Sequence, residues 1–292
     1  MIQLKGCSTA LLTPFRDGKV DFEAYRASVR RQVESGVDFL TALATTGETP
    51  TLSAEEKLEL LRITRQEAPS LPILAGCGSN SLDATIANIR LLEPLEPDAF
   101  LVVVPFYNKP TQQGQYLYFK AVSESTDIPI VIYNVPGRTG ANMTADTAVR
   151  LAEDCPGIIA TKEASGNFSQ VSEIIRRRPE GFSVLSGDDD MTLACMAAGA
   201  DGVISVASNV APQAVASMVH FLQEGKLDAA RELHHRLFPL FKACFVESNP
   251  VPAKAAMSLL GLMKDEVRLP LSRAAESTFA LMEKTLGDLQ LL

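Results

Sequence analysis

The sequence repeats one unit: a short, almost uninterrupted apolar run, then a polar break, then a helical pattern. Near-continuous Val, Ile and Leu runs are typical of strands covered on both faces, and hence of a parallel sheet. Eight such runs occur, at Cys7 to Thr13, Asp38 to Thr46, Leu71 to Cys77, Ala99 to Pro105, Ile128 to Asn134, Gly157 to Lys162, Phe182 to Gly187 and Asp201 to Ser208. Eight βα units predict an α/β protein, a (β/α)8 TIM barrel. A doubly wound open sheet is the weaker alternative, because Gly76 and Gly78 do not continue into a GxGxxG fingerprint.

The helical segments between the runs have recognisable ends. Ser53 followed by Glu56 predicts a capping box. Glycines are predicted to end the helices that begin near Asp21, Asp188 and Ala211, at Gly36, Gly199 and Gly225. Beyond Gly225 only helical patterns occur. We therefore predict a barrel over residues 1–224 and a C-terminal helical region over 225–292, packed on the barrel and able to carry a subunit contact.

Composition excludes several classes of protein. The 292 residues are 46% hydrophobic and 21% charged, which suits one large globular domain with or without a small appendage. A net charge of −8 argues against a nucleic-acid partner, which would demand a basic face. No apolar run reaches the ~18 residues of a membrane span, and the N-terminus lacks a signal-peptide pattern, so we expect a cytoplasmic protein without a membrane partner. Five scattered cysteines without a CxxC pair predict reduced thiols and neither a disulfide framework nor a zinc site.

Lys162 ends the apolar run IIATK and needs an explanation, because a lysine is poorly tolerated at a buried strand end. It could be a structural lysine that snorkels or pairs with an acid such as Glu163. Alternatively, a desolvated lysine can act as a nucleophile and form a Schiff base with a carbonyl substrate. With a pKa of about 10.4 only ~0.04% of the amine is neutral at pH 7, so this second hypothesis requires burial that brings the pKa to roughly 7–8.

Other strand ends carry polar side chains, and in such barrels the active site lies at these ends. Tyr107 and Tyr133 could be general acids or bases, or aromatic residues that cap the core. Thr45 and Thr46 could relay a proton and hold a carboxylate, or simply favour a strand. Arg138 could form a surface ion pair, but its guanidinium suits a substrate carboxylate. The last two strands offer Gly187 with Asp188, and Ile204 with Ser205.

The remaining candidates are weaker. The run Asp188 to Asp190 is typical of a helix start, where acids are favoured. His220, His234 and His235 lie in late helical patterns, and adjacent helical positions point in different directions, so no metal site is predicted. No Ser-His-Asp or Walker pattern is present.

Several motifs together carry a family resemblance that runs nearly from end to end. They are TTGETPTLS (45–53), PFYNKPTQQG (105–114), YNVPGRTG (133–140), KEASGN (162–167), LSGDD (185–189), GVISVASN (202–209) and ESNPVPAK (247–254). These stretches resemble the pyruvate-dependent class I aldolase family, which includes N-acetylneuraminate lyase, and most closely its dihydrodipicolinate synthase branch. The resemblance implies a lyase that condenses pyruvate with aspartate 4-semialdehyde in lysine (diaminopimelate) biosynthesis, without a metal or organic cofactor.

The resemblance also implies roles for the strand-end residues. Lys162 would form the Schiff base with pyruvate, and Tyr133 would shuttle protons. Thr45 and Tyr107 would complete the relay, with Tyr107 reaching in from a neighbouring subunit, so that a homodimer, usually paired into a homotetramer, would be needed. Thr46 would bind the pyruvate carboxylate.

Three further substrate-binding positions follow from the same resemblance. Backbone near Gly187 and Ile204 would help to hold pyruvate. Arg138 would receive the carboxylate of the semialdehyde.

The sequence departs from the family at its lysine-binding crevice. Family members inhibited by lysine use His, Glu and Tyr side chains there, whereas the matching positions are Ala54, Lys57, Ala84 and Phe106, with only Asn80 retained. Losing these partners and adding a positive charge disfavours a cationic effector, so we expect weak or absent lysine feedback.

Two other functions compete with this interpretation. One is N-acetylneuraminate lyase or a keto-sugar-acid aldolase, although Arg138 and the Thr45-Thr46 pair favour the synthase branch. The other is a catalytically silent barrel that serves as a binding protein, against which the set Thr45, Tyr107, Tyr133 and Lys162 argues.

Overall fold

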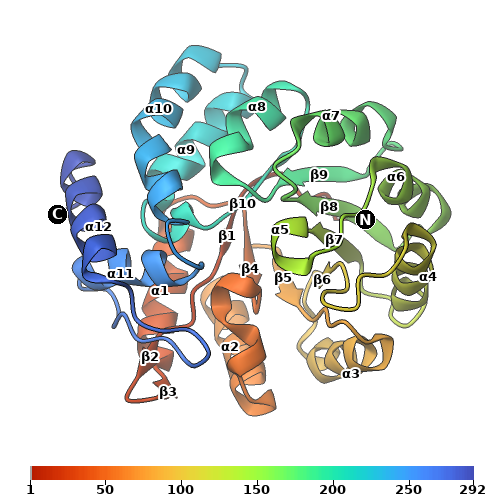
Figure 1. The fold of residues 1–292 in the computed structure, drawn as a ribbon, viewed down its shortest axis with the longest axis horizontal. Helices are drawn as coiled ribbons and strands as arrows, with labels where there is room; N and C mark the ends of the chain where they lie inside the picture. The colour runs from red at the N-terminus through yellow and green to blue at the C-terminus, as the bar shows by residue number, and fades with distance from the viewer. Residues whose placement is uncertain (1) are drawn as a thin grey trace.

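The computed structural model describes residues 2–292, which form a closed barrel of parallel strands wrapped by helices (Figure 1). The strands follow one another around the barrel in the order β1-β10-β9-β8-β7-β6-β5-β4. Their bounds are Gly6–Ala10 (β1), Phe39–Ala42 (β4), Ile73–Gly76 (β5), Ala99–Val103 (β6), Ile130–Asn134 (β7), Ile158–Glu163 (β8), Ser183–Ser186 (β9) and Gly202–Ser205 (β10). Each coincides with a predicted run, although β1 begins one residue before its run, at Gly6, and β8 ends one residue after its run, at Glu163. The TIM barrel is confirmed, and the open-sheet alternative is wrong.

A helix follows each strand of the barrel and packs on its outside. They are α1 (Phe22–Glu34), α2 (Ala54–Glu67), α3 (Leu82–Leu92), α4 (Gln112–Ser123), α6 (Ala145–Asp154), α7 (Phe168–Arg177), α8 (Thr192–Ala197) and α9 (Pro212–Gln223). The capping box at Ser53 and Glu56 is confirmed. The helix predicted near Asp188 begins as a 3-10 turn, η4 (Asp189–Met191), which continues into α8.

The sequence patterns did not predict several short elements. These are the hairpin of β2 (Phe15–Arg16) and β3 (Lys19–Val20), the one-turn helix α5 (Pro136–Thr139), and the 3-10 turns η1 (Thr45–Gly47), η2 (Thr49–Thr51), η3 (Glu93–Leu95) and η5 (Ala207–Asn209). They are too short to show a hydrophobic period. Two of them matter for function, because η1 and α5 lie at the C-terminal ends of β4 and β7.

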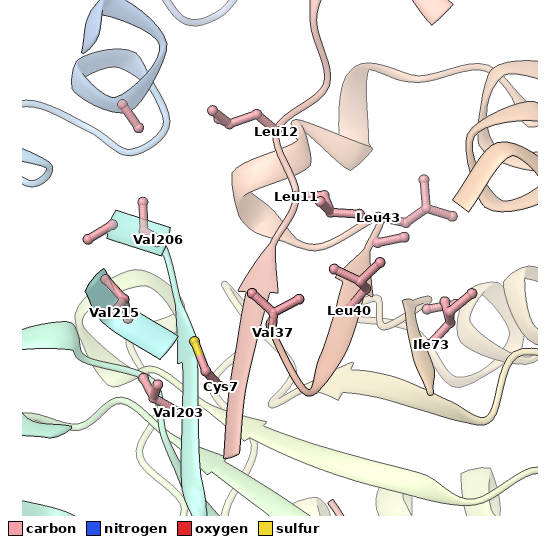
Figure 2. Close-up of a cluster of buried hydrophobic side chains, with 14 of the residues drawn as sticks. Cys7, Leu11, Leu12, Val37, Leu40, Leu43, Ile73, Val203, Val206 and Val215 are labelled. Atoms are coloured by element: carbon pink, nitrogen blue, oxygen red, sulfur yellow. The ribbon is translucent and has the colours of Figure 1, made fainter. Parts of the chain in front are cut away.

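Strand residues alternate between two apolar layers. Side chains that face outward pack against the helices, and Figure 2 shows Cys7 and Val203 on the strands together with Val215 of α9. Side chains that face inward form a second cluster that includes Leu74, Leu101, Val131, Tyr133, Ala160, Leu185 and Ile204. Successive strand residues point to opposite faces, so Lys162, two positions after Ala160, points into the barrel.

The C-terminal residues form the helices α10 (Leu227–Ala243), α11 (Val251–Leu259) and α12 (Glu276–Asp288). They lie along one side of the barrel, where α10 packs beside α9, and α12 packs against both α10 and α11 (Figure 1). Lys254 forms a buried ion pair with Glu48, and Arg268 pairs with Glu56 at 2.6 Å. The predicted helices are thus confirmed, and ion pairs join them to the barrel.

Two compositional expectations can be compared with the structure. The five cysteines are free and buried, so no disulfide framework forms. Among residues 2–292, every helix is too short or too polar to cross a membrane.

Candidate active site

Lys162 and Tyr133 lie side by side at the C-terminal ends of β8 and β7. They are register partners in the parallel pairing of these strands, and Lys162 Nζ lies 4.3 Å from the centroid of the Tyr133 ring. Lys162 is 4% exposed and Tyr133 is 7% exposed. A buried amine therefore lies against the face of a buried phenol, which is the arrangement that covalent catalysis with a proton shuttle requires.

The pKa of Lys162 is lowered to about 8, with burial as the largest cause. The negative charges of Asp188 and Asp189 oppose this shift, and the positive charge of Arg138 adds to it. A pKa of about 8 leaves about 9% of the amine neutral at pH 7, roughly 200 times the fraction at its usual pKa. The pKa of Lys162 therefore falls within the range of roughly 7–8 that the Schiff-base hypothesis requires.

The structural alternative for Lys162, a pair with Glu163, is wrong. Within residues 2–292, no carboxylate lies within ion-pair distance of Lys162. Glu163 follows it on the strand and points to the opposite face, where Asn134 and Gln170 donate to its carboxylate.

Gly187 provides room for the lysine side chain. A Cβ atom there would lie 2.6 Å from the Cβ of Ala164 and 3.1 Å from the Cε of Lys162. The Gly187 N–H already donates to the Glu163 carbonyl at 2.7 Å. Its contribution to the site is therefore the space beside Lys162, and it has no free N–H to offer a carboxylate. Ile204 is fully buried in the inner apolar cluster on β10.

The turn after β4 carries the two threonines. Leu43 adopts a positive φ of 56°, and Gly76 makes this possible, because a Cβ there would lie 1.9 Å from the Leu43 carbonyl oxygen. The chain then enters η1, where Thr45 interacts with the Tyr133 phenol and Thr46 is 2% exposed. Among the described residues, the N–H groups of Thr45 and Thr46 donate to no acceptor, so they remain available to a ligand.

Burial raises the pKa of the Tyr133 phenol, while the charge of Arg138 and the hydrogen bond with Thr45 act in the opposite direction. The phenol therefore stays protonated at neutral pH and can donate its proton. These three residues also line one cavity of about 380 Å³. Lys162 is not part of its lining but contacts Tyr133, which is.

Arg138 lies exposed at the mouth of this cavity, on the short helix α5. In the part of the chain that the structure describes, no carboxylate pairs with it. The surface ion pair considered from the sequence is absent there, and the guanidinium is free to receive an anion. Lys57 and Phe106 line the same cavity.

Tyr107 is the one predicted catalytic residue that a single chain does not bring to the site. It is 88% exposed in the loop between β6 and α4, with a positive φ of 72°, and it does not line the cavity. Its backbone N–H donates to the Thr139 carbonyl at 3.3 Å.

Sequence reasoning gave no role in the site to four residues that contribute to it. Asp188 was assigned to a helix start, yet its charge acts on Lys162. Asn249, from the C-terminal region, donates to Thr46 at 3.0 Å. Asn134 and Glu163 form a buried polar pair behind Tyr133 and Lys162. The position of each in the LSGDD, ESNPVPAK, YNVPGRTG or KEASGN motif was the only available signal.

Comparison with known proteins shows what kind of enzyme carries this site. The model of the dihydrodipicolinate synthetase family matches residues 3–288. The chain belongs to the dihydrodipicolinate synthetase family. The expected lyase of the class I, pyruvate-dependent aldolase type is thereby confirmed.

Relatives within the family agree over their full length. A 4-hydroxy-tetrahydrodipicolinate synthase of Thermotoga neapolitana is 43% identical over 292 residues, 99% of each chain. The crystal structure of dihydrodipicolinate synthase from Thermotoga maritima matches with a TM-score of 0.98 and 42% identity, covering 100% of both chains. A structure described as a monomeric dihydrodipicolinate synthase variant matches with a TM-score of 0.97 and 42% identity, covering 99% of this chain and 97% of that one. The expected synthase function is confirmed by these comparisons.

Proposed function

We propose that Lys162 carries out the synthase reaction of this family through a Schiff base with pyruvate. The observation that supports this most directly is the buried, carboxylate-free amine of Lys162 at 4.3 Å from the Tyr133 ring. The neutral amine attacks the ketone carbon of pyruvate, and Tyr133 donates a proton to the carbinolamine oxygen. Water leaves, and the iminium that forms is the electron sink of the reaction.

The next steps form the new carbon–carbon bond. Loss of a methyl proton converts the iminium into an enamine, and the enamine carbon attacks the aldehyde of aspartate 4-semialdehyde. The aldehyde oxygen takes up a proton through the relay of Tyr133 and Thr45. Attack of the substrate's own amine on the iminium carbon closes the ring and expels Lys162. No step needs a metal or an organic cofactor.

The substrate carboxylates have separate partners in this proposal. Thr46, deep in the turn after β4, binds the carboxylate of pyruvate, with backbone near Gly187 and Ile204 forming the floor. Arg138, exposed at the mouth, binds the carboxylate of the semialdehyde in its guanidinium fork. The alternative acceptors, sugar aldehydes, have no carboxylate for Arg138 to bind.

The test compares two aldehydes and locates the adduct. Purified protein should consume pyruvate rapidly with aspartate 4-semialdehyde and not with N-acetylmannosamine at equal concentration. Borohydride reduction with pyruvate should label the peptide that contains Lys162. Turnover with the sugar alone would show that the acceptor aldehyde is assigned wrongly. Labelling of another lysine, such as the buried Lys254, would show that Lys162 is not the nucleophile.

We further propose that Tyr107 completes the relay from a second copy of the chain. Its support is the 88% exposure of a tyrosine that the family pattern places in catalysis. The resulting homodimer pairs into a dimer of dimers. A cytoplasmic location fits the five unpaired, buried thiols, which a reducing compartment preserves.

Mixing two inactive variants tests the exchange of Tyr107. In a hybrid dimer of Tyr107→Phe and Lys162→Ala subunits, the Tyr107→Phe chain keeps its own Lys162 and receives Tyr107 from the other chain. Activity should therefore reappear after the two variants are dissociated and reassembled together. If Tyr107 acted within its own chain, neither site of the hybrid would be complete and the mixture would stay inactive.

A further inference from the structure

We propose that Asn249 is a positioning residue that fixes the Thr46 hydroxyl as a hydrogen-bond donor to the pyruvate carboxylate. Asn249 lies just before α11, in the C-terminal region, about 200 residues from Thr46 along the chain. This inference rests on the proposed binding of pyruvate by Thr46. It adds a residue from outside the barrel strands to those that form the pyruvate-binding site.

The hydrogen bond defines which way the hydroxyl can act. Asn249 Nδ2 donates to Thr46 Oγ1 at 3.0 Å, and the two residues are 5% and 2% exposed. A threonine hydroxyl has one proton and two lone pairs. Because the amide N–H occupies a lone pair, the hydroxyl proton must point away from Asn249.

The hydroxyl proton has no other acceptor in residues 2–292. A buried donor without a partner is costly, and proteins rarely retain one without a reason. A carboxylate placed at the turn would accept this proton in a charge-assisted hydrogen bond, which is stronger than a bond between neutral groups. The free N–H groups of Thr45 and Thr46 lie at the same turn and would favour the same ligand.

The hydrogen bonds of the Asn249 amide are only partly satisfied at this position. Its Oδ1 is buried and has no partner among the described residues, although Nδ2 is bonded. A side chain kept for local stability alone would gain more from an apolar replacement than from a half-satisfied buried amide. Its side chain forms one hydrogen bond among the described residues, to the Thr46 hydroxyl, so the orientation of this hydroxyl is what the amide controls.

The neighbouring contacts hold the donor in place. Five residues after Asn249, Lys254 forms its buried ion pair with Glu48, and the Arg268 N–H donates to the other Glu48 oxygen at 3.0 Å. Glu48 lies two residues after Thr46. The C-terminal region thus contacts this turn at two points: the ion pair fixes its backbone, and Asn249 orients its hydroxyl.

A double-mutant cycle tests the inference, with the KM for pyruvate as the readout. Thr46→Val removes the hydroxyl and should raise this KM on the order of tenfold or more, as loss of a hydrogen bond to a charged group does. Asn249→Ala should raise it several-fold, because the hydroxyl becomes free to turn. In the Thr46→Val background, Asn249→Ala should have less than about a twofold effect, since no hydroxyl remains to orient. The KM for the semialdehyde should not change.

Two more variants make the result decisive. Glu56→Gln removes another tie between the same two regions, the ion pair with Arg268, and should leave the KM for pyruvate unchanged. Asn249→Leu, similar in size and without a donor, should raise the KM for pyruvate as Asn249→Ala does, and it replaces the alanine variant in the cycle if that protein does not fold.

The outcomes separate the inference from the function on which it rests. If Thr46→Val leaves the KM for pyruvate unchanged, the proposed pyruvate site is wrong. If Thr46→Val raises it while the Asn249 variants do nothing, or act with full additivity, the pyruvate site stands and the positioning role of Asn249 is overturned.

Discussion

Asn134 donates to both carboxylate oxygens of Glu163, at 3.0 and 3.2 Å, across the ends of β7 and β8. Each residue directly follows one that we propose to be catalytic: Tyr133 and Lys162 are the preceding register partners on the same two strands. Gln170 of α7 adds a third bond to the carboxylate, at 3.1 Å. The polar pair behind the strands thus joins the two segments that hold the proposed nucleophile and the proposed proton shuttle.

Removing the charge of Glu163 should alter how stability depends on pH. Burial raises the pKa of its carboxyl to about 7, so the folded protein binds a proton that the unfolded chain loses near pH 4.5. This contribution to stability is complete below about pH 4.5 and is lost as the pH rises through 7, at most ~3 kcal/mol. Glu163→Gln should show a smaller fall in unfolding free energy between pH 5 and 8, measured by urea denaturation. The exposed Glu180→Gln should behave like the unmodified protein, and an unchanged slope in Glu163→Gln would contradict the assignment.

The rate of Schiff-base formation should rise with pH and level off above about 8. Only the neutral amine of Lys162 attacks pyruvate, and burial lowers its pKa to about 8. Arg138→Gln should move the midpoint to higher pH, because Arg138 lowers this pKa, and Asp188→Asn should move it lower. Borohydride trapping with pyruvate alone measures the rate without involving the second substrate. Shifts in the same direction for both variants would show that these charges do not act on Lys162.

Replacing the phenol of Tyr133 should slow turnover without preventing adduct formation. Tyr133→Phe keeps the ring beside Lys162 but removes the proton shuttle, for which a loss of about 10²–10⁴ in kcat is expected. Slow trapping of the pyruvate adduct should persist. Tyr116→Phe is the matched control, since Tyr116 donates to Asp154 outside the cavity and its loss should leave kcat unchanged. A Tyr133→Phe enzyme with normal kcat would exclude the phenol from catalysis.

The guanidinium of Arg138 should matter for one substrate only. Arg138→Lys keeps the charge but loses the two-pronged geometry, and we expect the KM for the semialdehyde to rise about tenfold, with a larger rise in Arg138→Gln. The affinity for pyruvate should stay close to normal, as measured by steady-state kinetics with each substrate varied in turn. Equal effects on both substrates would place Arg138 at a shared step instead.

Lysine should inhibit this enzyme weakly or not at all. Lys57 and Phe106 line the cavity beside Arg138, so a cationic amino acid would meet like charge there and lack the histidine and tyrosine partners of inhibited relatives. A titration of activity with lysine into the millimolar range should be nearly flat. Strong partial inhibition would contradict this prediction. In that case the charge of Lys57 does not keep lysine out, and Lys57→His should be no more sensitive to lysine than the unmodified chain.

The sequence by itself determined the barrel and the residues at its mouth. Apolar runs and helix ends are local patterns, and parallel strands bring their carboxyl ends to one rim, so the sequence is sufficient to assign Thr45, Tyr133, Arg138 and Lys162 to one site. The inward direction of Lys162 follows from strand alternation once the register is fixed. Its lowered pKa follows from the same burial.

Only the tertiary structure decided what supports those residues. The contacts Asn249–Thr46 and Lys254–Glu48 join segments about 200 residues apart, and their formation depends on how the C-terminal helices dock, which no local period encodes. The same holds for Asp188, whose influence on Lys162 arises only when β8 and β9 lie side by side in the closed sheet. Tyr107 depends on a further level of structure. Its side chain is exposed in a single chain, so the residues that it contacts are set by the assembly of several chains. Periodicity is a property of neighbouring residues, whereas these relationships follow from barrel closure and from the packing of distant elements.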